Sequence, residues 1–309
     1  MAQTTGTSVF TQDVNDLIEE AFERCGLELR TGYDFRTARR SLNLLTIEWA
    51  NRGINLWTVE QGQIAMTTGQ AIYPLPVDTI DLMDHVVRQN NGTTNQIDIN
   101  ITRIAEPTYI TIPNKLTQGR PIQVWVNRQS GQENATAITL SGNISATDTT
   151  ITLSSTVGLA TAGFIKIGSE TISYPNISGN QLLNCARGQN NTTAAAHTSG
   201  AAITVQNLPC INVWPTPNAP GDQYTFIYYR LRRIQDAGTG VNVQDIPFRF
   251  IPAMVAGLAY HLSMKLANVA PDRVVALKAS YEELFMQAAE EDREKAPLRF
   301  VPRNMNYTR

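Results

Sequence analysis

The sequence predicts an α+β protein with helices at both ends of the chain and β structure between them. Apolar residues recur at steps of three and four near the start and in the last third of the 309 residues, which indicates amphipathic helices. Short alternating runs bounded by Gly, Asn and Pro fill the middle, as in antiparallel strands. We therefore expect a four-helix layer from N- and C-terminal helical hairpins, an antiparallel β-sandwich or barrel body, and a second small all-β insertion domain.

The N-terminal helical hairpin is predicted over residues 1–55. An apolar stripe runs from Val14 to Cys25, and Gly26 follows where a helix C-cap favours positive φ. A second stripe begins near Asp34, which is the predicted N-cap, and ends before Gly53. Two antiparallel helices are the expected result.

A C-terminal helical pair is predicted over residues 246–296 and completes the helical domain. One apolar stripe begins at Ile251, and a second follows Pro271, a residue suited to the first turn of a helix. The last segment, 297–309, departs from the helical pattern. Its prolines favour an extended arm.

The β region divides by composition into a body, residues 56–129 and 208–245, and an inserted domain, residues 130–207. Only five charged residues occur between positions 129 and 210: Glu133, Asp148, Lys166, Glu170 and Arg187. The flanking stretches look like neighbouring strands of the body. We therefore place a compact β domain at a hairpin tip, where insertions are tolerated because both ends lie close together.

Composition excludes several function classes. The net charge of −2 and the pI near 6.0 lack the strong basic bias expected of a protein that neutralises many nucleic-acid phosphates. The three cysteines are widely spaced, so neither a disulfide framework nor a zinc site is predicted. The N-terminus lacks the features of a secretion signal, and no apolar run is long enough to cross a membrane. We expect a chain made in the cytoplasm, without a membrane partner.

No catalytic residue or cofactor is predicted. None of the three histidines has a nucleophile or a second ligand at a recognisable spacing: His85, His197 and His261. One acidic triplet has a spacing that suggests either a metal loop or a turn capped by acidic side chains: Asp78, Asp81 and Asp84. The turn is preferred, because the Gly and the distal Glu of a calcium loop are missing.

Two basic clusters are predicted to make subunit contacts. The first lies on the outer face of the second helix, and the first helix offers acidic partners for a neighbouring copy: Arg36, Arg39 and Arg40 with Glu19, Glu20 and Glu23. The second cluster ends a very apolar strand: Arg230, Arg232 and Arg233. Arg is preferred for carboxylate pairing at interfaces, which favours contacts over solvated faces.

The order of several motifs resembles a known family. The stretches "TGQAIYPLPVDTIDLMD", "VWVNRQ", "INVWPTP" and "YTFIYYRLRRIQDAG" lie between the paired helices. Together with those helices, over residues 10–128 and 208–290, they resemble the head-to-tail adaptor, or tail tubular protein A, of short-tailed bacteriophages. The insert, with "TAGFIKIGSETISYPNISG", is similar to a small β module of phage tail and neck proteins.

The resemblance implies a structural virion protein, assembled in the host cytoplasm. It implies a homo-oligomeric ring, usually of twelve copies, that docks under the portal protein and joins the DNA-filled head to the tail nozzle protein. DNA would pass through its channel without sequence-specific binding. The C-terminal arm would bind the portal through Arg299, Phe300, Arg303 and Tyr307. The alternatives are a virion fibre or adhesin whose β insert binds carbohydrate and, third, an enzyme.

Overall fold

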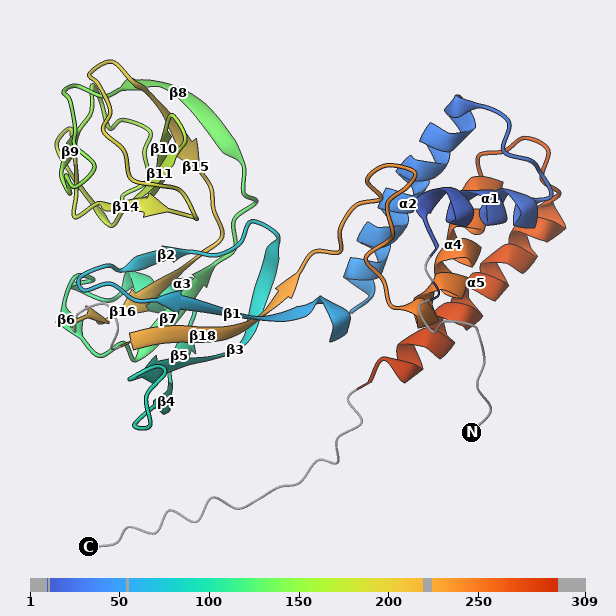
Figure 1. Cartoon of the computed structure of the whole chain (residues 1–309), viewed down its shortest axis with the longest axis horizontal. Helices are drawn as coiled ribbons and strands as arrows, with labels where there is room; N and C mark the ends of the chain where they lie inside the picture. Colours follow the sequence, from blue (N-terminus) through green and yellow to red (C-terminus); the bar gives the residue numbers. More distant parts are fainter. Residues whose placement is uncertain (1–9, 11, 54–55, 219–223, 294–309) are drawn as a thin grey trace, which may run out of the picture. The chain divides into compact units, whose positions relative to one another are not determined.

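The chain folds into two compact units. The computed structural model describes residues 10, 12–53, 56–218 and 224–293. One unit consists of residues 1–57 and 234–309 and holds the long helices, and the other consists of residues 58–233 and holds the strands (Figure 1). This division confirms the α+β class. No helix of the described ranges combines the length and the apolar character needed to cross a membrane.

In the part that the structure describes, the helical unit contains four long helices, three of which pack around the fourth. They are α1 (Val14–Cys25), α2 (Gly32–Arg52), α4 (Ile251–Ser263) and α5 (Pro271–Glu291). Helix α4 packs against the other three and is buried on nearly all sides, as expected of a helix that is apolar all round. A short 3₁₀ turn, η2 (Phe248–Phe250), leads into it.

Capping residues set the helix ends. Gly26 ends α1 with φ of +78°, as predicted, and Pro271 begins α5. The predicted N-cap of α2 was wrong by one turn. Thr31 is the N-cap, and its side chain accepts from the backbone N–H of Asp34, whose carboxylate accepts from the backbone N–H of Thr31 in return. Asp34 is thus the third residue of a reciprocal capping box.

The body contains two four-stranded sheets. The first has the order β1 (Val59–Ala65), β18 (Tyr224–Arg232), β3 (Thr79–Gln89), β4 (Ile97–Asn100). The second has the order β2 (Ile72–Pro74), β16 (Cys210–Trp214), β7 (Gln123–Asn127), β5 (Thr102–Ile104). Their apolar residues share one buried cluster, which includes Phe226, Val124 and Ile211. No sheet in the described ranges closes into a barrel.

Short elements complete the body. They are the helix α3 (Glu106–Ile110), which was not predicted, and a two-stranded parallel pair of β6 (Gln118–Gly119) with β17 (Thr216–Pro217). The 3₁₀ turn η1 (Leu56–Thr58) spans the point in the sequence where the helical unit ends and the strand unit begins. Helix α3 has only five residues, too few for a helical period to be visible in the sequence.

The predicted insert region has its own sheets and core. A five-stranded sheet has the order β14 (Ala186–Gln189), β11 (Glu170–Tyr174), β10 (Gly163–Ile167), β15 (Ala202–Gln206), β8 (Glu133–Thr139). A smaller sheet joins β12 (Asn176–Ser178), β13 (Gln181–Leu183) and β9 (Ile151–Thr152). Asn127 and Cys210, which flank the region, are paired across β7 and β16. The boundary at 130–207 stays a prediction.

Candidate interaction surfaces

The outward side of α2 carries a continuous row of exposed side chains, which we name the α2 outer stripe. Its members are spaced three or four residues apart: Tyr33, Arg36, Arg40, Leu44 and Ile47. The opposite side of α2 is buried, because its apolar residues follow the same period. Leu44 and Ile47 are 55% and 58% exposed. The stripe thus combines apolar surface with two guanidinium groups, and aromatic residues and Arg are enriched at protein interfaces.

The three predicted contact arginines of α2 differ in their surroundings. Arg39 is half-buried, and its Nη1 donates to the carbonyl oxygen of Gly238 at 3.0 Å, so it stabilises the helical unit itself. Arg40 donates only to Thr37 Oγ1 on its own helix, at 3.3 Å. Arg36 has no hydrogen bond or ion pair with any described residue. The inter-subunit role of all three stays a prediction; Arg39 makes a tertiary contact within the chain, whereas Arg36 and Arg40 make none with the described residues.

Helix α1 presents an acidic surface, which we name the α1 acidic face. Its members are exposed: Asp16, Glu19, Glu20 and Glu23. They line a shallow depression of about 430 Å³ together with Pro252 and Val255 of α4. Glu20 accepts from Arg24 Nε at 2.9 Å. Glu19 and Glu23 form no ion pair within the part of the chain that the structure describes. Their charges are therefore available to a cationic partner.

The predicted portal-binding residues Arg299, Phe300, Arg303 and Tyr307 lie outside the described residues. The point at which the chain leaves α5 is nevertheless fixed. Arg249 Nη1 donates to the carbonyl oxygen of Glu291 at 2.9 Å, and the backbone N–H of Leu56 donates to Asp292 Oδ2 at 3.0 Å. These contacts anchor the last turn of α5 to the preceding parts of the helical unit.

The arginines at the end of β18 were predicted to make subunit contacts, but two of them, Arg230 and Arg232, form ion pairs inside the strand unit. Arg230 is 9% exposed, and its Nη1 and Nη2 lie 2.6 Å from Asp78 and 2.8 Å from Glu60. Arg232 Nε lies 2.6 Å from Glu60. Burial disfavours the charged carboxylate of Asp78, but the hydrogen bond and charge of Arg230 outweigh it and lower the pKa of Asp78. These pairs fix β18 to its neighbours.

The acidic triplet and the histidines form no metal centre. Asp78 pairs with Arg230, and Asp81 pairs with Arg103 at 2.7 Å, whereas Asp84 is exposed on β3. No group of three or more His, Cys, Asp or Glu side chains suited to a metal ion occurs among the described residues. All three cysteines are buried and free of disulfide bonds.

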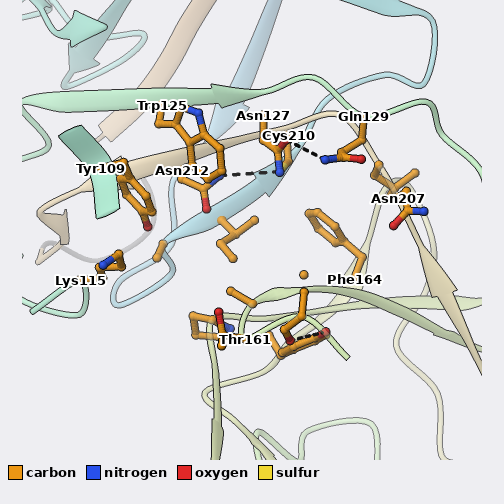
Figure 2. A pocket seen from close by; sticks show the side chains of 18 of the residues that line it. Tyr109, Lys115, Trp125, Asn127, Gln129, Thr161, Phe164, Asn207, Cys210 and Asn212 are labelled. Atoms are coloured by element: carbon orange, nitrogen blue, oxygen red, sulfur yellow. Dashed lines mark hydrogen bonds between the residues drawn. The ribbon is translucent and has the colours of Figure 1, made fainter. Parts of the chain in front are cut away.

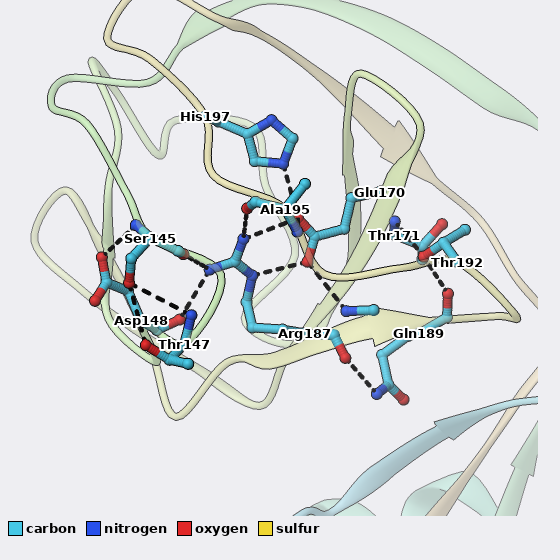
Figure 3. A network of polar contacts seen from close by, with 11 residues as sticks. Ser145, Thr147, Asp148, Glu170, Thr171, Arg187, Gln189, Thr192, Ala195 and His197 are labelled. Carbon is cyan, nitrogen blue, oxygen red and sulfur yellow. Dashed lines mark hydrogen bonds and ion pairs between the residues drawn. The ribbon is translucent and has the colours of Figure 1, made fainter.

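A buried ionic network occupies the centre of the insert (Figure 3), and only an indirect sign of it was visible in the sequence. Glu170 is fully buried, and its carboxylate accepts from Arg187 Nε and Nη2 at 2.8 Å each. His197 Nε2 lies 2.7 Å away, and the backbone N–H groups of Gly188 and Ala195 donate at 3.0 and 3.2 Å. The remaining Arg187 hydrogens reach backbone carbonyls, including that of Ala195.

The network fixes the long loop between β14 and β15. Burial disfavours the charged carboxylate, but the hydrogen bonds from Arg187, His197 and the backbone outweigh it and lower the pKa of Glu170 to about 2. The Glu170 carboxylate and the Arg187 guanidinium both have hydrogen-bond partners, so we interpret the network as structural. The indirect sign was the small number of charged residues in this segment. Buried charges need partners, so the few charged residues of a mostly uncharged domain are expected to pair with each other. Lys166 and Glu133 form a second such pair, at 2.9 Å.

Comparison with known proteins identifies the class to which these surfaces belong. The profile of the SU10 adaptor protein family matches residues 117–302, which is more than half of the chain. The chain therefore belongs to the SU10 adaptor protein family. This is a family of phage adaptors, so the protein is a phage structural adaptor that interacts with other head or tail proteins. No curated protein matches the chain.

Proposed function

We propose that the chain is the subunit of a head-to-tail adaptor ring that docks under the portal and joins the DNA-filled head to the tail nozzle. The family assignment supports the adaptor class over the fibre or adhesin alternative. The single structural observation that supports a ring is the pair of complementary surfaces in the helical unit, the α2 outer stripe and the α1 acidic face.

The two surfaces differ from one another, which determines the kind of assembly. When one surface of a subunit binds a different surface of the next, the contact is heterologous, and such contacts close into a ring or continue as a filament. Arg36 and Arg40 face outward with their charges uncompensated by any described acidic residue, and so do Glu19 and Glu23. Each exposed ion pair contributes about 0.2–1 kcal/mol. Leu44 and Ile47 add apolar burial to every contact of the ring.

Charge reversal tests the ring contact. The double variant Arg36→Glu/Arg40→Glu places like charges against the α1 acidic face of the next subunit. We expect sedimentation velocity to show a shift from ring toward monomer that is larger at low salt, where screening is weaker. The matched control is Arg120→Glu/Lys278→Glu, which changes the net charge equally at two other exposed positions.

A complementary variant gives a stricter test. Glu19→Arg/Glu23→Arg should also fail to assemble alone. Mixed with Arg36→Glu/Arg40→Glu, it should form rings again, because each reversed surface then meets a reversed partner. Assembly of both variants at wild-type strength would show that the contact lies elsewhere.

The proposed portal contact has its own experiment. We propose that the arm at 297–309 binds the portal through Arg299, Phe300, Arg303 and Tyr307. Ordering an extended arm costs about 1–2 kcal/mol of backbone entropy per residue, so binding depends on such anchors and on many arms docking together. Phe300→Ala/Tyr307→Ala should abolish co-sedimentation with portal rings, whereas Asn304→Ala/Thr308→Ala should not. Binding of the anchor variant at wild-type strength would assign docking to the helices.

A further inference from the structure

The strand unit contains a cavity of about 420 Å³ between one sheet of the body and the insert (Figure 2). Strands β7 and β16 of the body form one wall of the cavity, because alternate side chains of a strand point to opposite faces of its sheet. Val124 and Val126 of β7 belong to the buried cluster between the body sheets. The residues that alternate with them, Trp125 and Asn127, therefore face the cavity. Asn212 on β16 is the direct neighbour of Trp125 and shares this wall.

The wall carries a stacked aromatic pair. Tyr109 of α3 stacks with Trp125 at 5.1 Å between ring centroids and 28° between ring planes. Lys115 Nζ lies over the Tyr109 ring, 5.4 Å from its centroid, and donates to the carbonyl oxygen of Ile112 at 3.1 Å. On the opposite side, Phe164 of the insert closes the cavity.

Asn212 is the buried polar group of this cavity that lacks a full set of partners. Asn212 is only 5% exposed, and its Nδ2 has a single weak contact, with Cys210 Sγ at 3.8 Å. The carboxamide oxygen has no hydrogen bond with any described residue and points into the cavity (Figure 2). The oxygen is therefore an acceptor open to the cavity, and a ligand that displaces water there keeps it satisfied only if it brings a hydroxyl or N–H group.

Further carboxamides lie around the same space. Asn127 Oδ1 accepts from Gln129 Nε2 at 2.9 Å, and Asn207 lies at the insert side. Carboxamides donate and accept at adjacent atoms, as vicinal hydroxyl groups of a ligand require. Glu106 and Lys115 are the charged residues of the described lining, one of each sign, so the cavity does not select a strongly charged ligand.

We propose that this cavity binds a neutral saccharide unit. The apolar C–H face of a pyranose ring packs against the part of the half-buried Trp125 ring that Tyr109 leaves uncovered, and one of its hydroxyl groups donates to Asn212 Oδ1. The volume lies within the range of about 300–1,000 Å³ typical of small-ligand sites. A purely apolar occupant, such as a proline or leucine side chain of a peptide, would exclude water and leave the Asn212 oxygen unpaired. The inference goes beyond the proposed function, because ring assembly does not require a ligand.

Saturation-transfer NMR on the full chain tests the proposal. The probes are glucose, galactose, mannose, rhamnose and N-acetylglucosamine, each at about 10 mM, with acetyl-proline amide as the peptide probe. We expect at least one sugar to bind with a Kd of about 1 mM or tighter. Asn212→Leu, which keeps the side-chain size, should weaken binding at least about tenfold. Gln61→Leu, on exposed β1 and outside the cavity, should bind as wild type.

Asn207→Leu, at the insert side of the cavity, is a second variant in case Asn212→Leu does not fold, and circular dichroism checks both. Asn207→Leu should weaken binding of the same sugar, because it removes a carboxamide from the cavity without changing a residue inside a strand of the body sheets. Absence of transfer from every sugar would overturn the proposal, and so would binding of acetyl-proline amide alone, which would indicate a peptide socket. Wild-type sugar affinity in the folded Asn variants would overturn the location.

Discussion

Replacing Glu170 by Gln removes one charge from the buried network of the insert and keeps the size of the side chain. The carboxylate accepts two hydrogen bonds from Arg187 and two from backbone N–H groups, and it also contacts His197 Nε2. In the variant, the Arg187 side chain, which is only 6% exposed, has no countercharge. Removing one partner of a buried ion pair costs about 3–5 kcal/mol.

The same contacts also lower the pKa of this carboxylate, which gives a second way to express their magnitude. Its pKa is held at about 2 in the folded chain, against an ordinary value of 4.5. The folded pKa is the lower one, so the carboxylate stabilises the fold fully above pH ~4.5, and this contribution is lost as the pH falls toward 2. The difference corresponds to about 3 kcal/mol at neutral pH, in agreement with the cost of breaking the pair.

Amide hydrogen exchange of the full chain, followed peptide by peptide, measures the effect where it occurs. At neutral pH, Glu170→Gln should speed exchange of peptides from residues 163–206 by about a hundredfold and leave the body sheets unchanged. The control is Glu133→Gln, which alters a carboxylate 45% exposed and paired with Lys166 at the surface. It should change exchange by no more than about fivefold. Equal effects of the two variants would refute the reasoning, and so would a wild-type insert whose protection does not fall between pH 4.5 and 2.5.

Three further outcomes are expected. Tyr281→Phe removes a hydroxyl that accepts from Trp49 Nε1 and donates to Glu48, both at 2.9 Å, and should lower the free energy of unfolding by about 1–3 kcal/mol in urea titrations, with an unchanged value arguing against the network. Gly257→Ala places a Cβ 2.8 Å from the Tyr281 ring, so the melting temperature should fall despite the better helix propensity of Ala. Replacing residues 130–207 by a short Gly-Ser linker should leave the helical and body signals in circular dichroism, because loop closure costs little and the body strands pair with each other; global unfolding would contradict the proposed boundary.

The α+β class and the positions of the four long helices could be predicted from the sequence. These features depend on neighbours along the chain, since a helical stripe, Gly26 at a C-cap and Pro271 at a first turn each act within a few residues. The scarcity of charge in the insert region was equally visible. The start of α2 was not, because Thr31 and Asp34 both suit a cap and only their reciprocal hydrogen bonds decide between them.

Which charged and polar groups remain available to a partner depends on the packing of distant segments, and the sequence did not predict it. Arg36, Arg39 and Arg40 look alike in the sequence, yet Arg39 donates to Gly238, 199 positions further along the chain. Arg230 is likewise occupied by residues far away in the sequence. Partners at such separations are set by packing, which local patterns do not contain. For the same reason, the unpaired oxygen of Asn212 becomes visible only when the sheets and the insert are placed together.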